Sequence, residues 1–154
     1  METNMAENNR TSIYLSPQLA DEKRKWADAA FGGFSRRLTS ILERLEFVVS
    51  DAIPDFNRPE WCAIFDALNG YWMEGRLGIT GIPLQLSDAI NMDGLDEKWG
   101  FDGKAFLKKL NALSPAGLVA VAEVSDEFWL NTERDIDEFI ANIQARKAQC
   151  RGFR

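Results

Sequence analysis

The chain has 154 residues, of which 45% are hydrophobic and 27% charged, and its formal net charge is −6. This length and balance are typical of one or two soluble globular domains with a real hydrophobic core. The sequence contains no histidine, which excludes Ser-His-Asp and Cys-His catalysis and histidine-ligated metal sites. Chemistry built on carboxylates and lysines survives this exclusion, but the carboxylate pairs of this chain are spread among lysines on amphipathic helices, as on solvated faces. We expect a protein that is not an enzyme and that holds no metal or cofactor.

The termini and the cysteines favour a cytoplasmic protein. Residues 1–9 are polar and acidic, lack the features of a signal peptide, and are predicted to form a disordered arm. No apolar run approaches the roughly 20 residues that cross a bilayer, so no membrane contact is expected. Cys62 and Cys150 have no metal-ligand spacing and are expected to be reduced thiols.

Charge is distributed unevenly along the chain. Between Arg10 and Leu45 there are seven Lys and Arg against four Asp and Glu, whereas from Ile53 onward there are eleven against sixteen. A mildly basic front and an acidic back indicate two different roles.

Residues 10–19 are predicted to hold a single β-strand, which ends before the helix start at Ser16 and Pro17. Ile13 and Leu15 would face one side of it, and Arg10, Ser12 and Tyr14 the other. An unpaired strand leaves its backbone hydrogen-bonding groups bare, and the chain has no convincing second strand. The simplest partner is the same strand of a second copy across a two-fold axis, which predicts a homodimer or a higher oligomer. The alternative is pairing inside one α+β domain, with residues 78–84.

Helical patterns follow the strand. Ser16 and Pro17 are predicted to begin a short helix, which a Gly-Gly pair ends. Ser35 is predicted to cap a longer amphipathic helix that Pro54 ends, and residues 53–59 are the predicted boundary between two halves. Its apolar residues recur at helical spacing: Leu38, Ile41, Leu42, Leu45, Val48 and Val49.

The second half, residues 53–154, is predicted to be an acidic all-α domain. The expected helices begin near Pro59, at Pro83, at Asp102 or Gly103, at Ser114–Pro115, and after a pair resembling a capping box, Thr132 and Asp135. The alternation over residues 119–124 could indicate a strand. The preceding cap, the alanines and the length of the apolar run favour a helix instead.

Residues 10–52, about a third of the chain, resemble the ribbon-helix-helix family of bacterial, phage and plasmid repressors and antitoxins. The segments that carry the resemblance are Thr11–Leu19, Phe31–Ser35 and Arg36–Leu45, which read as strand and short helix, Gly-containing turn, and longer helix. The expected fold is therefore mainly α, with an N-terminal ribbon-helix-helix dimerisation unit followed by an all-α domain.

The resemblance implies a homodimeric, sequence-specific DNA-binding regulator, of the repressor or antitoxin kind, in a bacterial, phage or plasmid context. A two-stranded ribbon fits the DNA major groove, where its outward side chains would contact base edges. The base-contacting residues would be Arg10, Ser12 and Tyr14; the phosphate-contacting residues Ser35, Arg36 and Arg37; and the dimer core Ile13, Leu15, Leu38, Ile41, Leu42 and Leu45. The two arginines could equally belong to an ordinary solvated helix start.

A rival hypothesis is a protein-binding inhibitor or adaptor, of a phage or plasmid kind, with no DNA role. It depends on the acidic total and on the tryptophans of the second half, which could line a partner surface. Those candidates are Trp61, Trp72, Trp99 and Trp129. Core packing is the default role of these four side chains, and a partner surface is the alternative.

Overall fold

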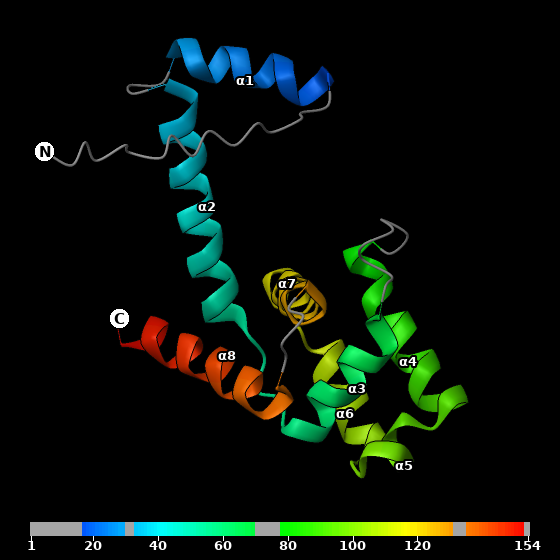
Figure 1. Cartoon of the computed structure of the whole chain (residues 1–154). Helices are drawn as coiled ribbons and strands as arrows, with labels where there is room; N and C mark the ends of the chain where they lie inside the picture. The colour runs from blue at the N-terminus through cyan, green and yellow to red at the C-terminus, as the bar shows by residue number, and fades with distance from the viewer. Residues whose placement is uncertain (1–16, 30–32, 70–77, 131–134, 153–154) are drawn as a thin grey trace, which may run out of the picture. The chain divides into compact units, whose positions relative to one another are not determined.

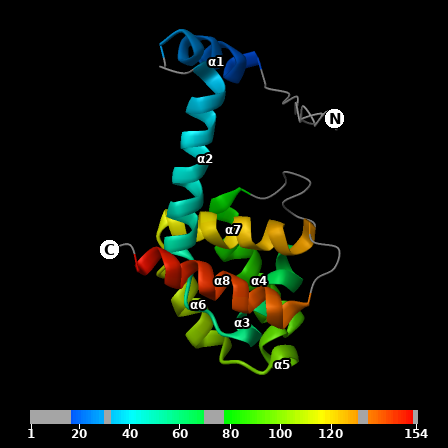
Figure 2. The same ribbon diagram turned by 60° about the vertical axis from the view of Figure 1, so that its left-hand side comes forward.

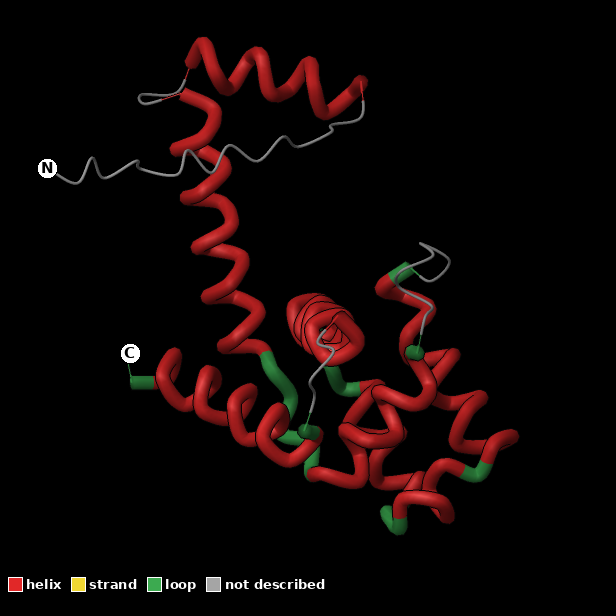
Figure 3. The backbone as a smooth tube through the Cα atoms, in the orientation of Figure 1, coloured by secondary structure: helices red, strands yellow, loops and turns green. Residues whose placement is uncertain are grey.

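The computed structural model describes residues 17–29, 33–69, 78–130 and 135–152, and within these ranges every regular element is helical (Figure 3). The chain divides into two compact units, residues 1–43 and 44–154. In chain order the helices are α1 (Pro17–Ala29), α2 (Gly33–Ala52), α3 (Arg58–Leu68), a 3-10 turn η1 (Ile79–Gly81), α4 (Ile82–Asp93), α5 (Leu95–Trp99), α6 (Gly103–Asn111), α7 (Pro115–Leu130) and α8 (Ile136–Arg151).

The predicted ribbon-helix-helix unit is wrong, whereas the mainly-α class is confirmed. The described residues contain no strand, and residues 10–16, which held the predicted strand, lie outside the described part of the chain. The helix α1 begins at Pro17, as Ser16 and Pro17 predict. Proline presets a helical φ at that position, and leucine, alanine, glutamate and lysine after it are good helix formers. A strand before it would have needed backbone hydrogen bonds from a second chain.

The second helix begins earlier than predicted. It starts at Gly33, so Ser35 lies inside its first turn rather than capping it. The backbone carbonyl of Ser35 accepts a hydrogen bond of 2.9 Å from the Thr39 hydroxyl. The predicted end is confirmed, because α2 stops at Ala52, two residues before Pro54.

A capping box that the sequence analysis missed begins α3. Asn57 Oδ1 accepts a hydrogen bond from the Glu60 backbone N–H at 3.0 Å, and Glu60 Oε2 accepts one from the Asn57 N–H at 2.8 Å. Asn-Arg-Pro-Glu is the sequence signal for this motif. Glu60 is buried, and its Oε1 lies 2.7 Å from Lys109 Nζ on α6. The box therefore joins the start of α3 to a second helix.

The core of residues 44–154 is built around α3, which contacts α4, α5, α7 and α8 (Figures 1 and 2). Phe65 on α3 stacks on Phe128 of α7, with ring centroids 4.1 Å apart, and Phe139 of α8 meets both rings edge-on. Phe56, in the segment between α2 and α3, contacts Trp61 and Phe106 edge-on. This aromatic cluster ties together four helices and that connecting segment.

Most remaining helix boundaries follow the predicted signals. Gly94, with a left-handed φ of 62°, ends α4, and Asp102 caps α6 through the Ala105 N–H. The Ser114 hydroxyl accepts from the Gly117 N–H at the start of α7, whose helical state over residues 119–124 is confirmed.

Two boundaries differ. The short helix α5 was not predicted, since its five residues are too few to show a period. Asp135 is itself the N-cap of α8 and accepts hydrogen bonds from the Asp137 and Glu138 N–H groups, rather than closing a box on Thr132. Thr132 lies outside the described residues.

Candidate interaction surfaces

Part of the predicted DNA-binding and dimerisation site falls outside the residues that the structure describes. The base-contacting candidates Arg10, Ser12 and Tyr14, together with the dimer-core candidates Ile13 and Leu15, lie outside the described residues, as does the predicted arm of residues 1–9.

The phosphate-contacting candidates are described and solvent-exposed. Ser35, Arg36 and Arg37 all lie in the first two turns of α2. Their exposure is compatible with a solvated helix start as well as with an anion contact. Residues 1–43 carry six Lys and Arg and six Asp and Glu, so this unit has no net positive charge.

The three tryptophan candidates that the structure describes pack in or against the core. Trp61 is 1% exposed and belongs to the core of α3. Trp99 is half-buried and donates its indole N–H to Asp66 at 2.9 Å, while Trp129 is half-buried and donates to the Phe65 carbonyl at 3.1 Å. Trp72 lies outside the described residues. For the three that are placed, core packing describes their role.

Several exposed apolar side chains of the described residues lie on α2. Its apolar stripe, predicted from the sequence, comprises Leu38, Ile41, Leu42, Leu45, Val48 and Val49. Leu42, Leu45 and Val48 are 54%, 43% and 48% exposed, whereas Val49 is 4% exposed. These three exposed residues are each three apart, so they occupy adjacent turns of one helix face. We call them the exposed stripe.

Phe47 is equally exposed, at 45%, but does not belong to this face. At 3.6 residues per turn it lies almost opposite Leu45. It therefore provides an internal comparison, a large apolar residue of similar exposure on the other side of the same helix.

Charged residues of opposite sign border the exposed stripe on its two sides. Helical geometry places Arg37 and Arg44 along one edge and Glu46 along the other. Glu46 is held by Arg146 of α8 at 2.9 Å, and the same guanidinium donates to Glu127 of α7 at 2.6 Å. Within residues 44–154, these pairs join the last turns of α2 to α7 and α8.

Carboxylates gather near this arginine. Partial burial raises the pKa of Glu123, and the neighbouring charges of Asp126, Glu127 and Glu46 raise it further. Burial also raises the pKa of Asp126. These groups lie within one acidic unit: residues 44–154 carry 12 Lys and Arg against 18 Asp and Glu.

Three further properties of the described residues bear on metal binding, membrane crossing and thiol reactivity. Among these residues no three potential metal ligands converge, and no helix is long and apolar enough to span a bilayer. Cys62 is buried in α3, and burial raises the pKa of its thiol. A raised pKa lowers the thiolate fraction and hence the reactivity of this cysteine.

Comparisons with protein-family models, with curated proteins and with solved structures found no match to this chain.

Proposed function

We propose that this chain is a homodimeric helical binding protein, of the adaptor or inhibitor kind, rather than an enzyme. The observation that carries the proposal is the exposed stripe of α2. Contiguous apolar residues that stay uncovered on a protein surface mark interaction sites more often than isolated ones do. A second copy of the same helix is the occupant that best fits this face.

The spacing of the α2 residues supports a second copy. Alternating steps of three and four place apolar side chains at the a and d positions of a coiled-coil seam. These positions are Leu38, Ile41, Leu45, Val48 and Ala52. The seam is short, and its C-terminal end turns into the core of residues 44–154, so we expect a reversible dimer rather than a permanent one.

The arginines favour a parallel over an antiparallel pairing. With Leu38 and Leu45 at a positions, Arg37 and Arg44 fall at g. In an antiparallel pair the g edges of the two helices meet, so arginines would oppose arginines. In a parallel pair the g edge lies beside the partner e edge, which carries the uncharged Leu42 and Val49. Repulsion of this kind selects the orientation rather than adding affinity.

Sedimentation equilibrium over a range of concentrations tests the proposal. The unmodified chain is expected to self-associate, and the double variant Leu45→Gln with Val48→Gln is expected to remain monomeric. Phe47→Gln, on the opposite face, is the matched control and should associate like the unmodified chain. A monomer at all concentrations, or equal weakening by Phe47→Gln, would overturn the proposal.

DNA binding is the competing function, and a gel-shift assay with the same protein tests it. The part of the chain that the structure describes contains no strand to form the predicted β-ribbon, and the acidic charge of residues 44–154 repels phosphates. We therefore expect no gel shift with duplex DNA at physiological salt. A shift that disappears in Arg36→Gln with Arg37→Gln would instead favour a DNA-binding role for the start of α2.

A further inference from the structure

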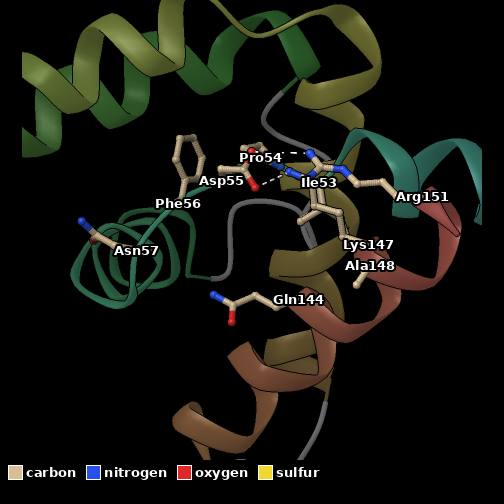
Figure 4. Close-up of a pocket in the computed structure, with 9 residues that line it drawn as sticks. All are labelled: Ile53, Pro54, Asp55, Phe56, Asn57, Gln144, Lys147, Ala148 and Arg151. Atoms are coloured by element: carbon tan, nitrogen blue, oxygen red, sulfur yellow. Dashed lines mark hydrogen bonds and ion pairs between the residues drawn. The ribbon is translucent and has the colours of Figure 1, made fainter.

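A cavity of about 520 Å³ lies between the segment joining α2 to α3 and one face of α8 (Figure 4). Its apolar lining comes from Ile53, Pro54 and Phe56 on the segment and from Ala148 on α8. This volume is within the range of small-molecule sites, which combine apolar walls with a few polar groups.

Three charged groups lie together at this cavity. Lys147 Nζ is 2.5 Å from Asp55 Oδ1, and a guanidinium nitrogen of Arg151 is 3.6 Å from Asp55 Oδ2 (Figure 4). The hydrogen bond from Lys147 is the main cause that lowers the pKa of Asp55. Two cations therefore face one carboxylate, which leaves an excess of one positive charge at the cavity.

The two cations have different roles. The Lys147 side chain is only 9% exposed, so its ammonium needs the Asp55 carboxylate as a counter-charge. The Arg151 side chain is 61% exposed, and its 3.6 Å contact is too long for a good hydrogen bond. Its planar guanidinium can therefore offer a pair of N–H donors to a second carboxylate.

We propose that this cavity binds an organic monocarboxylate with an apolar body, the carboxylate on Arg151 and the body against Pro54, Phe56 and Ala148. One added negative charge neutralises the excess positive charge of Lys147, Arg151 and Asp55. A dianion would leave a net negative charge and would be repelled by the Asp55 carboxylate. A free small acid and the C-terminal carboxylate of an apolar peptide share this chemistry. The site is independent of the exposed stripe on α2.

An NMR titration of the full chain with 3-phenylpropionate, followed by amide shifts, tests the site. We expect shifts in residues 53–57 and 144–151 and a dissociation constant on the order of 1 mM, as for a ligand of this size. The uncharged analogue 3-phenylpropionamide should bind about tenfold more weakly, because it lacks the charge-assisted pair with Arg151. A tripeptide ending in phenylalanine, compared with its C-terminal amide, distinguishes the two sources. Tighter binding of the free-acid peptide than of phenylpropionate identifies a chain terminus as the ligand.

Three variants make the test specific. Arg151→Gln should weaken binding of the acid about tenfold and leave the amide unchanged, while Lys108→Gln, an exposed lysine on α6, should change neither. Asp55→Asn should strengthen binding of the acid, since it removes the competing carboxylate, with thermal melting as the check that it folds.

Several results would overturn the proposal. They are equal binding of acid and amide, binding insensitive to Arg151→Gln, weaker or unchanged binding in folded Asp55→Asn, and no shifts at all.

Discussion

The aromatic cluster around Phe65 and the exposed stripe of α2 differ in burial, although both consist of apolar side chains on helices. Phe65 and Phe128 are buried and stacked, with Phe139 closing the cluster. Leu45 and Val48 have the same apolar character and the same helical spacing, yet each is nearly half exposed. Amphipathic spacing alone therefore does not distinguish a core face from a docking face, and what distinguishes them is whether another helix of the chain covers the face.

The largest expected effect is on the buried side of this comparison. Phe65→Ala removes a ring that contacts Phe128, Phe139 and Trp61, and should lower the free energy of unfolding by about 3–5 kcal/mol in a urea titration. Phe47→Ala, the same substitution at an exposed position, should change it by no more than about 0.5 kcal/mol. Similar losses at both positions would mean that Phe47 is also covered.

The second-largest expected effect on the free energy of unfolding is at the N-cap of α3. Asn57→Ala removes the side chain that accepts from the Glu60 N–H, and should cost about 1 kcal/mol of unfolding free energy. Asn142→Ala, at an exposed position within α8, should be neutral or slightly stabilising, because alanine is the better helix former. A neutral Asn57→Ala would show that the Glu60–Lys109 pair holds this turn without the cap.

The third prediction concerns the exposed stripe, whose effect on stability should depend on the protein concentration. In dilute solution, Leu45→Gln with Val48→Gln should change the unfolding free energy by no more than about 0.5 kcal/mol, since both side chains are exposed. The unmodified chain should gain thermal stability as its concentration rises, because association stabilises the folded state, and the double variant should not. A concentration-independent melting temperature in both proteins would argue against the dimer.

The smallest effect tests the acidic cluster beside Arg146. The raised pKa of Glu123 means that the folded state favours its protonated form, so the unmodified protein loses stability as pH rises through that pKa. Glu123→Gln should therefore be more stable at neutral pH, by about 0.5 kcal/mol or less. Thermal melts should show this advantage shrinking as the pH is lowered. Glu43→Gln, at an exposed position on α2, is the control and should show no such trend.

Several parts of the fold could be predicted because their causes are local. The starts of α1 and α7 follow from a serine or a proline at the boundary, and Gly94 ends α4 because glycine adopts a left-handed φ without strain. The capping box of Asn57 and Glu60 is equally local, because the four residues Asn-Arg-Pro-Glu carry the whole signal. The predicted strand depended on the opposite kind of cause, since its stability would have come from a partner outside the local sequence, and the described residues contain no strand.

The cavity and its charges could not have been predicted in this way. Asp55 and Lys147 are 92 residues apart, and no spacing rule brings them together. The same is true of Trp61, whose burial depends on Phe56 and Phe65 packing around it.

By itself, the sequence determined the helices and the apolar face of each, because backbone preferences, caps and side-chain period act over a few residues. Only the tertiary structure decided which of those faces is covered and which charged groups meet. Burial and ion pairing depend on neighbours brought in from distant segments, and those neighbours cover Phe65 while leaving Leu45 and Val48 in solvent.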